Sequence, residues 1–223
     1  MRPVLYVLLV TCLLPEIANG APKTHVLSFG KWTTVKWFVG PGQDNPLDLK
    51  IRTLYVDGRP KEFTLGTAHD VTDRLIVVRR AFRLNDALPE ETSSVPSWRW
   101  QRGGWLLVDR ITGHVTPINL PEFDSFYSKA AWYRDYVAYC GVSDDGKILY
   151  AVLAQLGRRK PILKKALGDA PADDVPDSAC PAPRWQRQPL RVSFSSPLDQ
   201  TLTYSVRGHA VDVVNDEEEE GTK

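Results

Sequence analysis

Apolar and polar residues alternate along much of this chain, most clearly between residues 133 and 167. Two apolar runs there flank a turn built on Asp144, Asp145 and Gly146. Asp hydrogen-bonds its own backbone in turns, and Gly tolerates the positive φ that tight hairpins need. Every second residue of a strand lies on the same face. One face of the first run therefore carries Tyr136, Ala138, Cys140 and Val142, and one face of the second run carries Ile148, Tyr150, Val152, Ala154 and Leu156. The pattern predicts an antiparallel hairpin of half-buried strands.

Short runs of the same kind, separated by turn residues, predict strands along the rest of the chain. The expected strands are 31–39, 49–56, 61–65, 75–82, 105–111, 114–120, 190–195, 201–206 and 209–214. Asp57-Gly58 and Thr112-Gly113 are predicted hairpin turns. Residues 85–97 and 168–189 are polar and Pro-rich, which predicts surface loops. Residues 121–131 are expected to connect strands through one short helical turn, and 160–167 fits a strand better than a helix.

These elements predict an all-β protein of antiparallel sheets, arranged as a sandwich or a partial propeller, with little helix. Residues 22–214 are long enough for one β domain, and a sub-boundary near 85–97 is the alternative. Residues 1–21 carry an early Arg2, a short apolar run and small residues at 18–20. These are the features of a secretory signal, and the run is too short for a stable membrane span. We therefore expect a secreted or periplasmic protein.

The charge is unevenly distributed. The chain as a whole has a formal net charge of +1, but residues 22–210 hold 26 basic and 20 acidic side chains. Residues 215–223 include the run Glu217–Glu220, which cannot bury apolar surface and is expected to be a disordered acidic tail. The basic excess is smaller than a nucleic-acid-binding face requires, so nucleic acid is not an expected partner.

Two of the three cysteines, Cys140 and Cys180, lie after the predicted signal. An even pair in an exported protein predicts one disulfide between them. Two cysteines without a C-x-x-C motif do not make a Cys-rich zinc site, and no metal or other cofactor is expected.

Two stretches resemble the hairpins of bacterial β-propeller blades. Residues 105–118 (WLLVDRITGHVTPI) resemble an outer hairpin in which an aspartate ends a strand before a Thr-Gly turn. Residues 142–150 (VSDDGKILY) resemble the Ser-Pro-Asp-Gly-Lys turn of those repeats, with Asp144 in place of Pro. No fixed-period repeat spans the chain. The resemblance implies a local hairpin geometry and no particular function.

Candidate binding residues are few. Trp98, Trp100 and Trp105 lie among polar residues, and exposed tryptophans stack on sugar rings or cations, although most tryptophans fill cores. His69 and Asp70 are adjacent, so the carboxylate could orient the imidazole if both lie in a loop. On a strand the two side chains would point to opposite faces.

No nucleophile elbow, P-loop or dinucleotide-binding motif is present in the sequence. We therefore expect an exported bacterial β protein that acts as a non-catalytic binding or structural module of the cell envelope. Alternatives are a secreted or periplasmic hydrolase acting on sugars or envelope polymers, and a carbohydrate-binding module. The corresponding partners are carbohydrate or another envelope protein.

Overall fold

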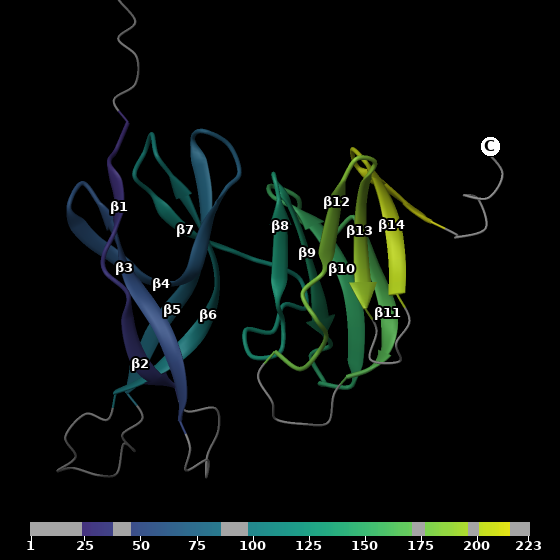
Figure 1. Ribbon diagram of the computed structural model, residues 1–223, viewed down its shortest axis with the longest axis horizontal. Helices are drawn as coiled ribbons and strands as arrows, with labels where there is room; N and C mark the ends of the chain where they lie inside the picture. Colours follow the sequence, from purple (N-terminus) through teal and green to yellow (C-terminus); the bar gives the residue numbers. More distant parts are fainter. Residues whose placement is uncertain (1–23, 38–45, 86–97, 171–176, 196–200, 215–223) are drawn as a thin grey trace, which may run out of the picture.

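The protein consists of two β lobes (Figure 1). The structure, a computed structural model, describes residues 24–37, 46–85, 98–170, 177–195 and 201–214. Fifteen strands in three sheets and no helix occur within these ranges, which confirms the predicted all-β class. The predicted signal (1–21), the acidic tail (215–223) and most of the predicted loop at 85–97 lie outside the described residues.

The first lobe, residues 27–118, is a small barrel. Its strands are β1 (Leu27–Phe29), β2 (Thr33–Trp37), β3 (Leu47–Val56), β4 (Arg59–Asp70), β5 (Leu75–Asn85), β6 (Trp98–Asp109) and β7 (Val115–Ile118). Strands β3, β2, β6, β5 and β4 pair in that order, and β4 pairs back with β3, so the ring closes. Every pair is antiparallel except β2–β6. Closure protects edges that an open sheet would expose.

The turn between β3 and β4 confirms the hairpin expected at Asp57-Gly58. Both residues have positive φ, 52° and 73°. They join the paired residues Val56 and Arg59, as a two-residue hairpin of the primed type requires.

The second lobe, residues 130–213, is a sandwich of two four-stranded sheets. One sheet holds β8 (Ala130–Tyr133), β9 (Tyr136–Val142), β10 (Ile148–Gln155) and β11 (Leu163–Asp169). The other holds β12 (Arg184–Arg187), β13 (Leu190–Ser195), β14 (Thr201–Arg207) and β15 (Ala210–Val213). Apolar side chains from both sheets, such as Leu149, Leu153, Val192 and Phe194, fill the space between them. The hairpin expected at 136–156 is therefore confirmed, with Val142 opposite Leu149.

The prediction that β9 is half-buried is wrong, because all seven of its residues are buried. One face, with Ala138 and Cys140, belongs to the sandwich core. The other face, with Val137 and Tyr139, packs in a cluster that also contains Val77 and Trp105 of the first lobe. This face is covered by the first lobe and by the segment that joins the lobes, and alternation along one strand cannot reveal such a contact.

The same cluster explains the uninterrupted apolar run at the start of β5. Ile76 and Val78 point into the barrel core, whereas Val77 between them joins the cluster shared with the second lobe. A strand covered on both sides needs apolar residues at every position. The lobes are thus packed against each other, and residues 119–129 lead from one to the other.

Two details, one in the second lobe and one in the segment that leads to it, differ from expectation. Residues 184–187, placed in the loop 168–189, form strand β12, and its Trp185 donates an indole hydrogen bond to Ala131 O of β8 at 3.0 Å. Residues 121–129 contain turns but no helix. Residues 163–169 form β11, so the strand favoured for 160–167 is confirmed.

The predicted disulfide is present. Cys140 on β9 and Cys180 are bonded, with their Cα atoms 6.1 Å apart. No helix capable of crossing a membrane occurs in the described part of the chain. The two stretches that resemble propeller blades each form a hairpin, β6–β7 and β9–β10.

Candidate functional site

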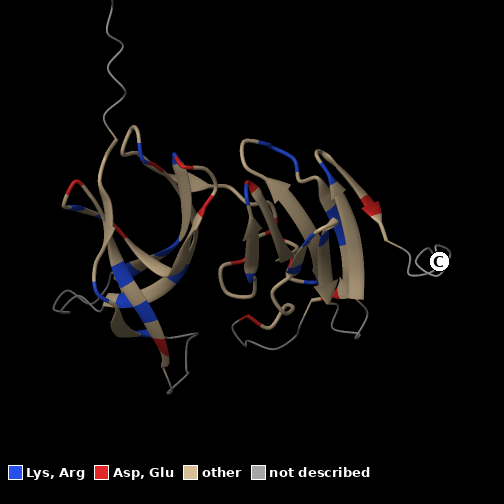
Figure 2. Ribbon diagram, turned by 45° about the horizontal axis from the view of Figure 1, so that its top comes forward, with Lys and Arg blue, Asp and Glu red and all other residues tan. Residues whose placement is uncertain are grey.

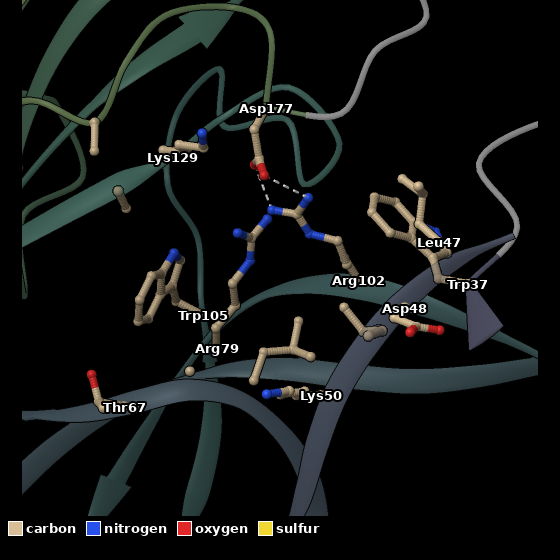
Figure 3. A pocket seen from close by; sticks show the side chains of 15 residues that line it. Trp37, Leu47, Asp48, Lys50, Thr67, Arg79, Arg102, Trp105, Lys129 and Asp177 are labelled. Carbon is tan, nitrogen blue, oxygen red and sulfur yellow. Dashed lines mark hydrogen bonds and ion pairs between the residues drawn. The ribbon is translucent and has the colours of Figure 1, made fainter. Parts of the chain in front are cut away.

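A cavity of about 770 Å³ opens where the two lobes meet (Figure 3). The first lobe supplies most of its wall from β2, β3, β4, β5 and β6. The second lobe supplies the start of β8 and the segment around the disulfide. The lining residues are Trp37, Leu47, Asp48, Leu49, Lys50, Leu65, Gly66, Thr67, Arg79, Arg102, Trp105, Lys129, Ala130, Asp177 and Ala182. The volume is in the range of small-molecule sites.

An ion pair crosses the cavity from one lobe to the other. Arg102 of β6 donates two hydrogen bonds to the carboxylate of Asp177, at 3.0 and 2.5 Å. The Arg102 side chain is only 9% exposed, and its guanidinium also lies 4.9 Å from the centre of the Trp37 ring. Two parallel bonds between planar groups hold the pair in one geometry. Asp177 is therefore satisfied by Arg102.

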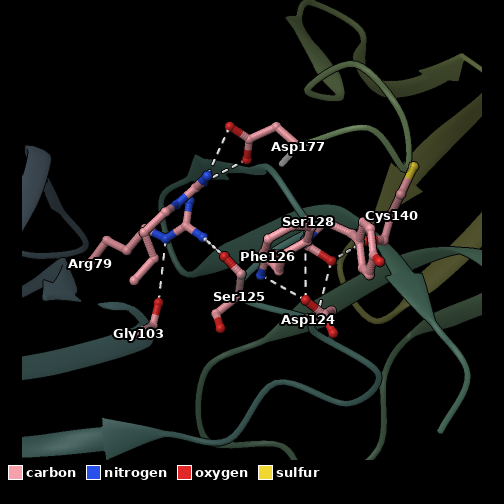
Figure 4. Close-up of polar contacts among 10 residues, drawn as sticks. Arg79, Gly103, Asp124, Ser125, Phe126, Ser128, Cys140 and Asp177 are labelled. Carbon is pink, nitrogen blue, oxygen red and sulfur yellow. Dashed lines mark hydrogen bonds and ion pairs between the residues drawn. The ribbon is translucent and has the colours of Figure 1, made fainter. Parts of the chain in front are cut away.

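Arg79 of β5 is the second arginine of the cavity, and its partners are neutral. Its guanidinium donates to Ser125 O at 2.6 Å and to Gly103 O at 3.4 Å (Figure 4). Burial, followed by repulsion from Arg102, lowers the pKa of Arg79 to about 10, and the nearby charges of Asp177 and Asp124 oppose this shift in part. Taking a charge out of water is unfavourable unless it meets an opposite charge. Arg79 therefore supplies positive potential to the cavity.

The disulfide connects to both arginines through two short segments, and Figure 4 shows the one that runs from Cys140 to Arg79. The Cys140 carbonyl accepts a 2.6 Å hydrogen bond from the Ser128 hydroxyl. This bond anchors the turn in which Ser125 O accepts from Arg79. From Cys180, the chain runs back three residues to Asp177, the partner of Arg102.

The two segments also hold each other. The Asp177 backbone N–H donates to Phe126 O at 2.8 Å. The Asp124 carboxylate accepts from the backbone N–H groups of Phe126 and Tyr127, at 2.6 and 3.1 Å, and this fixes the turn. We call residues 124–128 and 177–180, joined by these bonds and the disulfide, the clasp.

Two lysines complete the charge of the cavity. Lys129 follows the clasp directly and is half-buried, and Lys50 is exposed on β3. Neither forms a salt bridge with another residue in the described ranges. Asp48, the other acidic lining residue, is paired with Lys36 at 2.5 Å. The lining thus has two more positive than negative charges, and Figure 2 shows basic residues gathered on strands of the first lobe.

Trp105 contributes an unused donor. Its side chain is buried, with 9% of the residue exposed, and its indole nitrogen has no hydrogen-bond partner. Its ring meets Trp132 of β8 edge to face, with centres 5.3 Å apart. Buried indole N–H groups normally have an acceptor, so this one is an unsatisfied donor in the wall of the cavity.

His69 and Asp70 do not act as a pair. They are neighbours at the end of β4, and each turns to a different partner, as adjacent strand residues do. His69 stacks on Trp132 at 6.0 Å and its Nε2 bonds Arg134 O at 2.8 Å, which places it at the contact between lobes. Asp70 forms an ion pair with Arg110 at 2.9 Å.

The three tryptophans of β6 have three different environments. Trp98 is 56% exposed, and Arg83 lies 5.5 Å from its ring centre. Trp100 is half-buried against Phe63, with ring centres 5.0 Å apart. Only Trp105 lines the cavity. The structure thus brings Trp105 and His69 together through Trp132 and leaves Trp98 on the surface.

Comparisons with protein-family models, with curated proteins and with solved structures found no match to this chain. No group of three or more His, Cys, Asp or Glu side chains that could hold a metal occurs among the residues that the structure describes.

Sequence reasoning missed the charged residues of the site: Arg79, Arg102, Lys129, Lys50 and Asp177. A weak signal existed for two of them. Arg79 follows directly on the apolar run of β5, and Arg102 stands in the middle of a strand rich in tryptophan. Their burial depends on the second lobe, so the sequence gives no direct sign of it.

Proposed function

We propose that this chain is an exported bacterial β protein that acts as a non-catalytic binding module of the cell envelope, with the cavity between its lobes as the ligand site. The observation that carries the proposal is the unpartnered indole N–H of Trp105, buried in the wall of a cavity with excess positive charge. Clefts between structural units, apolar with a few polar groups, are typical ligand sites.

The acidic groups of the cavity support binding over catalysis. Asp177 is held by Arg102 and Asp48 by Lys36, so each carboxylate already has a cationic partner. A general acid or base must lie within hydrogen-bond reach of the proton that it transfers, and both carboxylates of the cavity are instead engaged by these cations.

A thermal-shift screen with a library of small molecules tests the binding role. We expect at least one compound to raise the melting temperature, because a ligand that binds only the folded state stabilises it. The variant Thr67→Trp places a large ring at an exposed position of the cavity wall and should abolish that shift. The control Thr201→Trp, exposed on β14, should retain it. A shift that survives Thr67→Trp would place binding elsewhere.

Export is tested separately by expressing the full chain in a bacterium and determining the mass of the protein recovered from the periplasm or medium. The proposal predicts a chain shortened by about 21 residues at its N-terminus, as the length of a secretory signal implies. An unprocessed chain retained in the cytoplasm would contradict it.

Trp98 supports a second candidate, a carbohydrate-binding role. Its exposed ring beside Arg83 suits stacking against a sugar. In a glycan-array screen, loss of binding in Trp98→Ala but not in Trp105→Phe would favour this surface over the cavity.

A further inference from the structure

We propose that the cavity between the lobes binds a small organic anion, a molecule with an apolar body and one anionic group such as a carboxylate, sulfonate or phosphate. This inference rests on the proposed binding function and specifies its ligand class.

The first argument is the unequal charge of the lining. Both carboxylates, Asp48 and Asp177, are already paired, while Arg79 and Lys129 have no carboxylate bonded to them among the described residues. Unit charges a few ångströms apart in a partly desolvated site interact far more strongly than in water. An anion entering the cavity would therefore meet attraction from two cations that bond no carboxylate.

The second argument is the cost of burying Arg79 without an anion. Its guanidinium donates only to the carbonyls of Ser125 and Gly103, and burial lowers its pKa to about 10. Hydrogen bonds to neutral carbonyls compensate a buried charge less than an ionised partner does. A bound anion would supply that partner.

The third argument is the free donor of Trp105. Its ring is part of the cavity wall, and its buried Nε1 lacks an acceptor. An oxygen of a carboxylate, sulfonate or phosphate provides the acceptor that this N–H lacks. Figure 3 shows Trp105 and Arg79 side by side on the same wall of the cavity.

The fourth argument concerns the ligand's body. Leu47, Leu49, Leu65 and the Trp37 ring form the rest of the wall, and Leu47 is 44% exposed. A ligand that covers this apolar surface removes it from water, and this burial contributes favourably to the free energy of binding. Inorganic anions would use the charges and leave this wall uncovered, so an organic anion fits the cavity better.

Two fluorescent probes with the same apolar body separate these contributions. Anilinonaphthalene sulfonate carries one negative charge, and phenylnaphthylamine is its neutral counterpart. We expect the anion to bind the native protein with one-to-one stoichiometry and at least about tenfold more tightly than the neutral probe, a ratio that a single charge-assisted contact provides. Sodium sulfate should compete only weakly.

Variants locate the bound anion. Lys129→Met should weaken binding of the anionic probe by about tenfold and leave the neutral probe unchanged, since only the charge is removed. Trp105→Phe should also weaken the anionic probe. The control Lys165→Met, an exposed lysine of β11 outside the cavity, should change neither.

The outcomes distinguish the preference for an anion from the existence of a ligand site in the cavity. Equal affinity for both probes, lost in Thr67→Trp, would overturn the anion preference and leave the binding site in place. If Lys129→Met, Trp105→Phe and Thr67→Trp all leave binding of the anionic probe unchanged, the proposal that the cavity holds the anion is overturned. Failure of both probes to bind the native protein would overturn the organic-anion inference, while the thermal-shift screen would still decide the binding function.

Discussion

Arg102 shows how much a single residue of this protein depends on its partner in the other lobe. It sits in the middle of β6, almost fully buried, where an unpaired cation would be strongly unfavourable. Asp177 satisfies it through two hydrogen bonds, and Trp37 packs against its flat face. The pair thus holds an arginine inside a region that would otherwise demand an apolar side chain.

The substitution Asp177→Asn tests this dependence. It leaves the buried Arg102 charge without a counter-ion and close to Arg79, so we expect a loss of about 3 kcal/mol in the free energy of unfolding, the low end for a broken buried pair. Urea denaturation measures the loss. The control Asp212→Asn, exposed on β15, should stay within about 0.5 kcal/mol of the native protein. Similar small losses in both variants would contradict the role of the pair.

Tyr139 provides a second test at this scale, based on pH. Its ring is fully buried and its hydroxyl donates to Pro121 O at 2.6 Å. Burial, with the nearby charge of Glu122, raises its pKa well above the ordinary value of 10. The folded state therefore needs the protonated phenol. The contribution of the buried phenol to the free energy of unfolding is complete below pH 10. It decreases as the pH rises above that value, by up to about 1.4 kcal/mol per pH unit.

The variant Tyr139→Phe should lose about 1 kcal/mol at pH 8, because Pro121 O loses its donor. The free energy of unfolding should fall less between pH 8 and pH 11 in the variant than in the native protein, because the variant has no buried phenol at this position that must stay protonated. Urea denaturation at both values gives the comparison. An equal or steeper alkaline loss in the variant would contradict the assignment.

At the scale of elements, the clasp links the sandwich core to the cavity. Cys140 belongs to β9, in the middle of the sandwich, and Cys180 ends the segment that carries Asp177. The Ser128 hydroxyl and the Asp124 turn extend the same connection to Arg79. The disulfide therefore stabilises the fold and also restricts the position of the cavity's charged groups.

Removal of the disulfide tests both effects. The double variant Cys140→Ala, Cys180→Ala should lose roughly 4 kcal/mol of unfolding free energy, the chain-entropy value for a loop of about 40 residues. In this background Asp177→Asn should cost clearly less than in the native protein, because a loosened segment no longer holds Asp177 on Arg102. Additive losses would show that the disulfide and the ion pair act independently.

At the scale of the whole molecule, features set by local residue patterns could be predicted from the sequence, whereas features set by contacts between distant segments could not. The strands followed from alternation, the turn at Asp57-Gly58 from its residue types, and the Cys140–Cys180 bond from simple pairing. The second covered face of β9, the strand containing Trp185 and the burial of Arg79 did not follow, because each results from packing between units distant in the sequence. Only two of the five candidate residues, Trp105 and His69, come to the junction of the lobes.

The cavity accordingly belongs to the molecule as a whole. Its two arginines come from the barrel, Asp177 comes from the clasp, and Lys129 comes from the segment between the lobes. A ligand bound there would contact both lobes at once. The surface tryptophan Trp98 lies apart from this site, at the start of β6.

The most direct measurement is a ¹H–¹⁵N spectrum of the indole N–H groups of the seven tryptophans, with the Trp105 signal assigned through Trp105→Phe. Titration with anilinonaphthalene sulfonate should move the Trp105 signal strongly downfield, as an unpaired donor gains an acceptor, and leave the Trp98 signal nearly unchanged. A Trp105 signal that stays in place while the probe binds, or a shift confined to Trp98, would contradict the cavity as the ligand site.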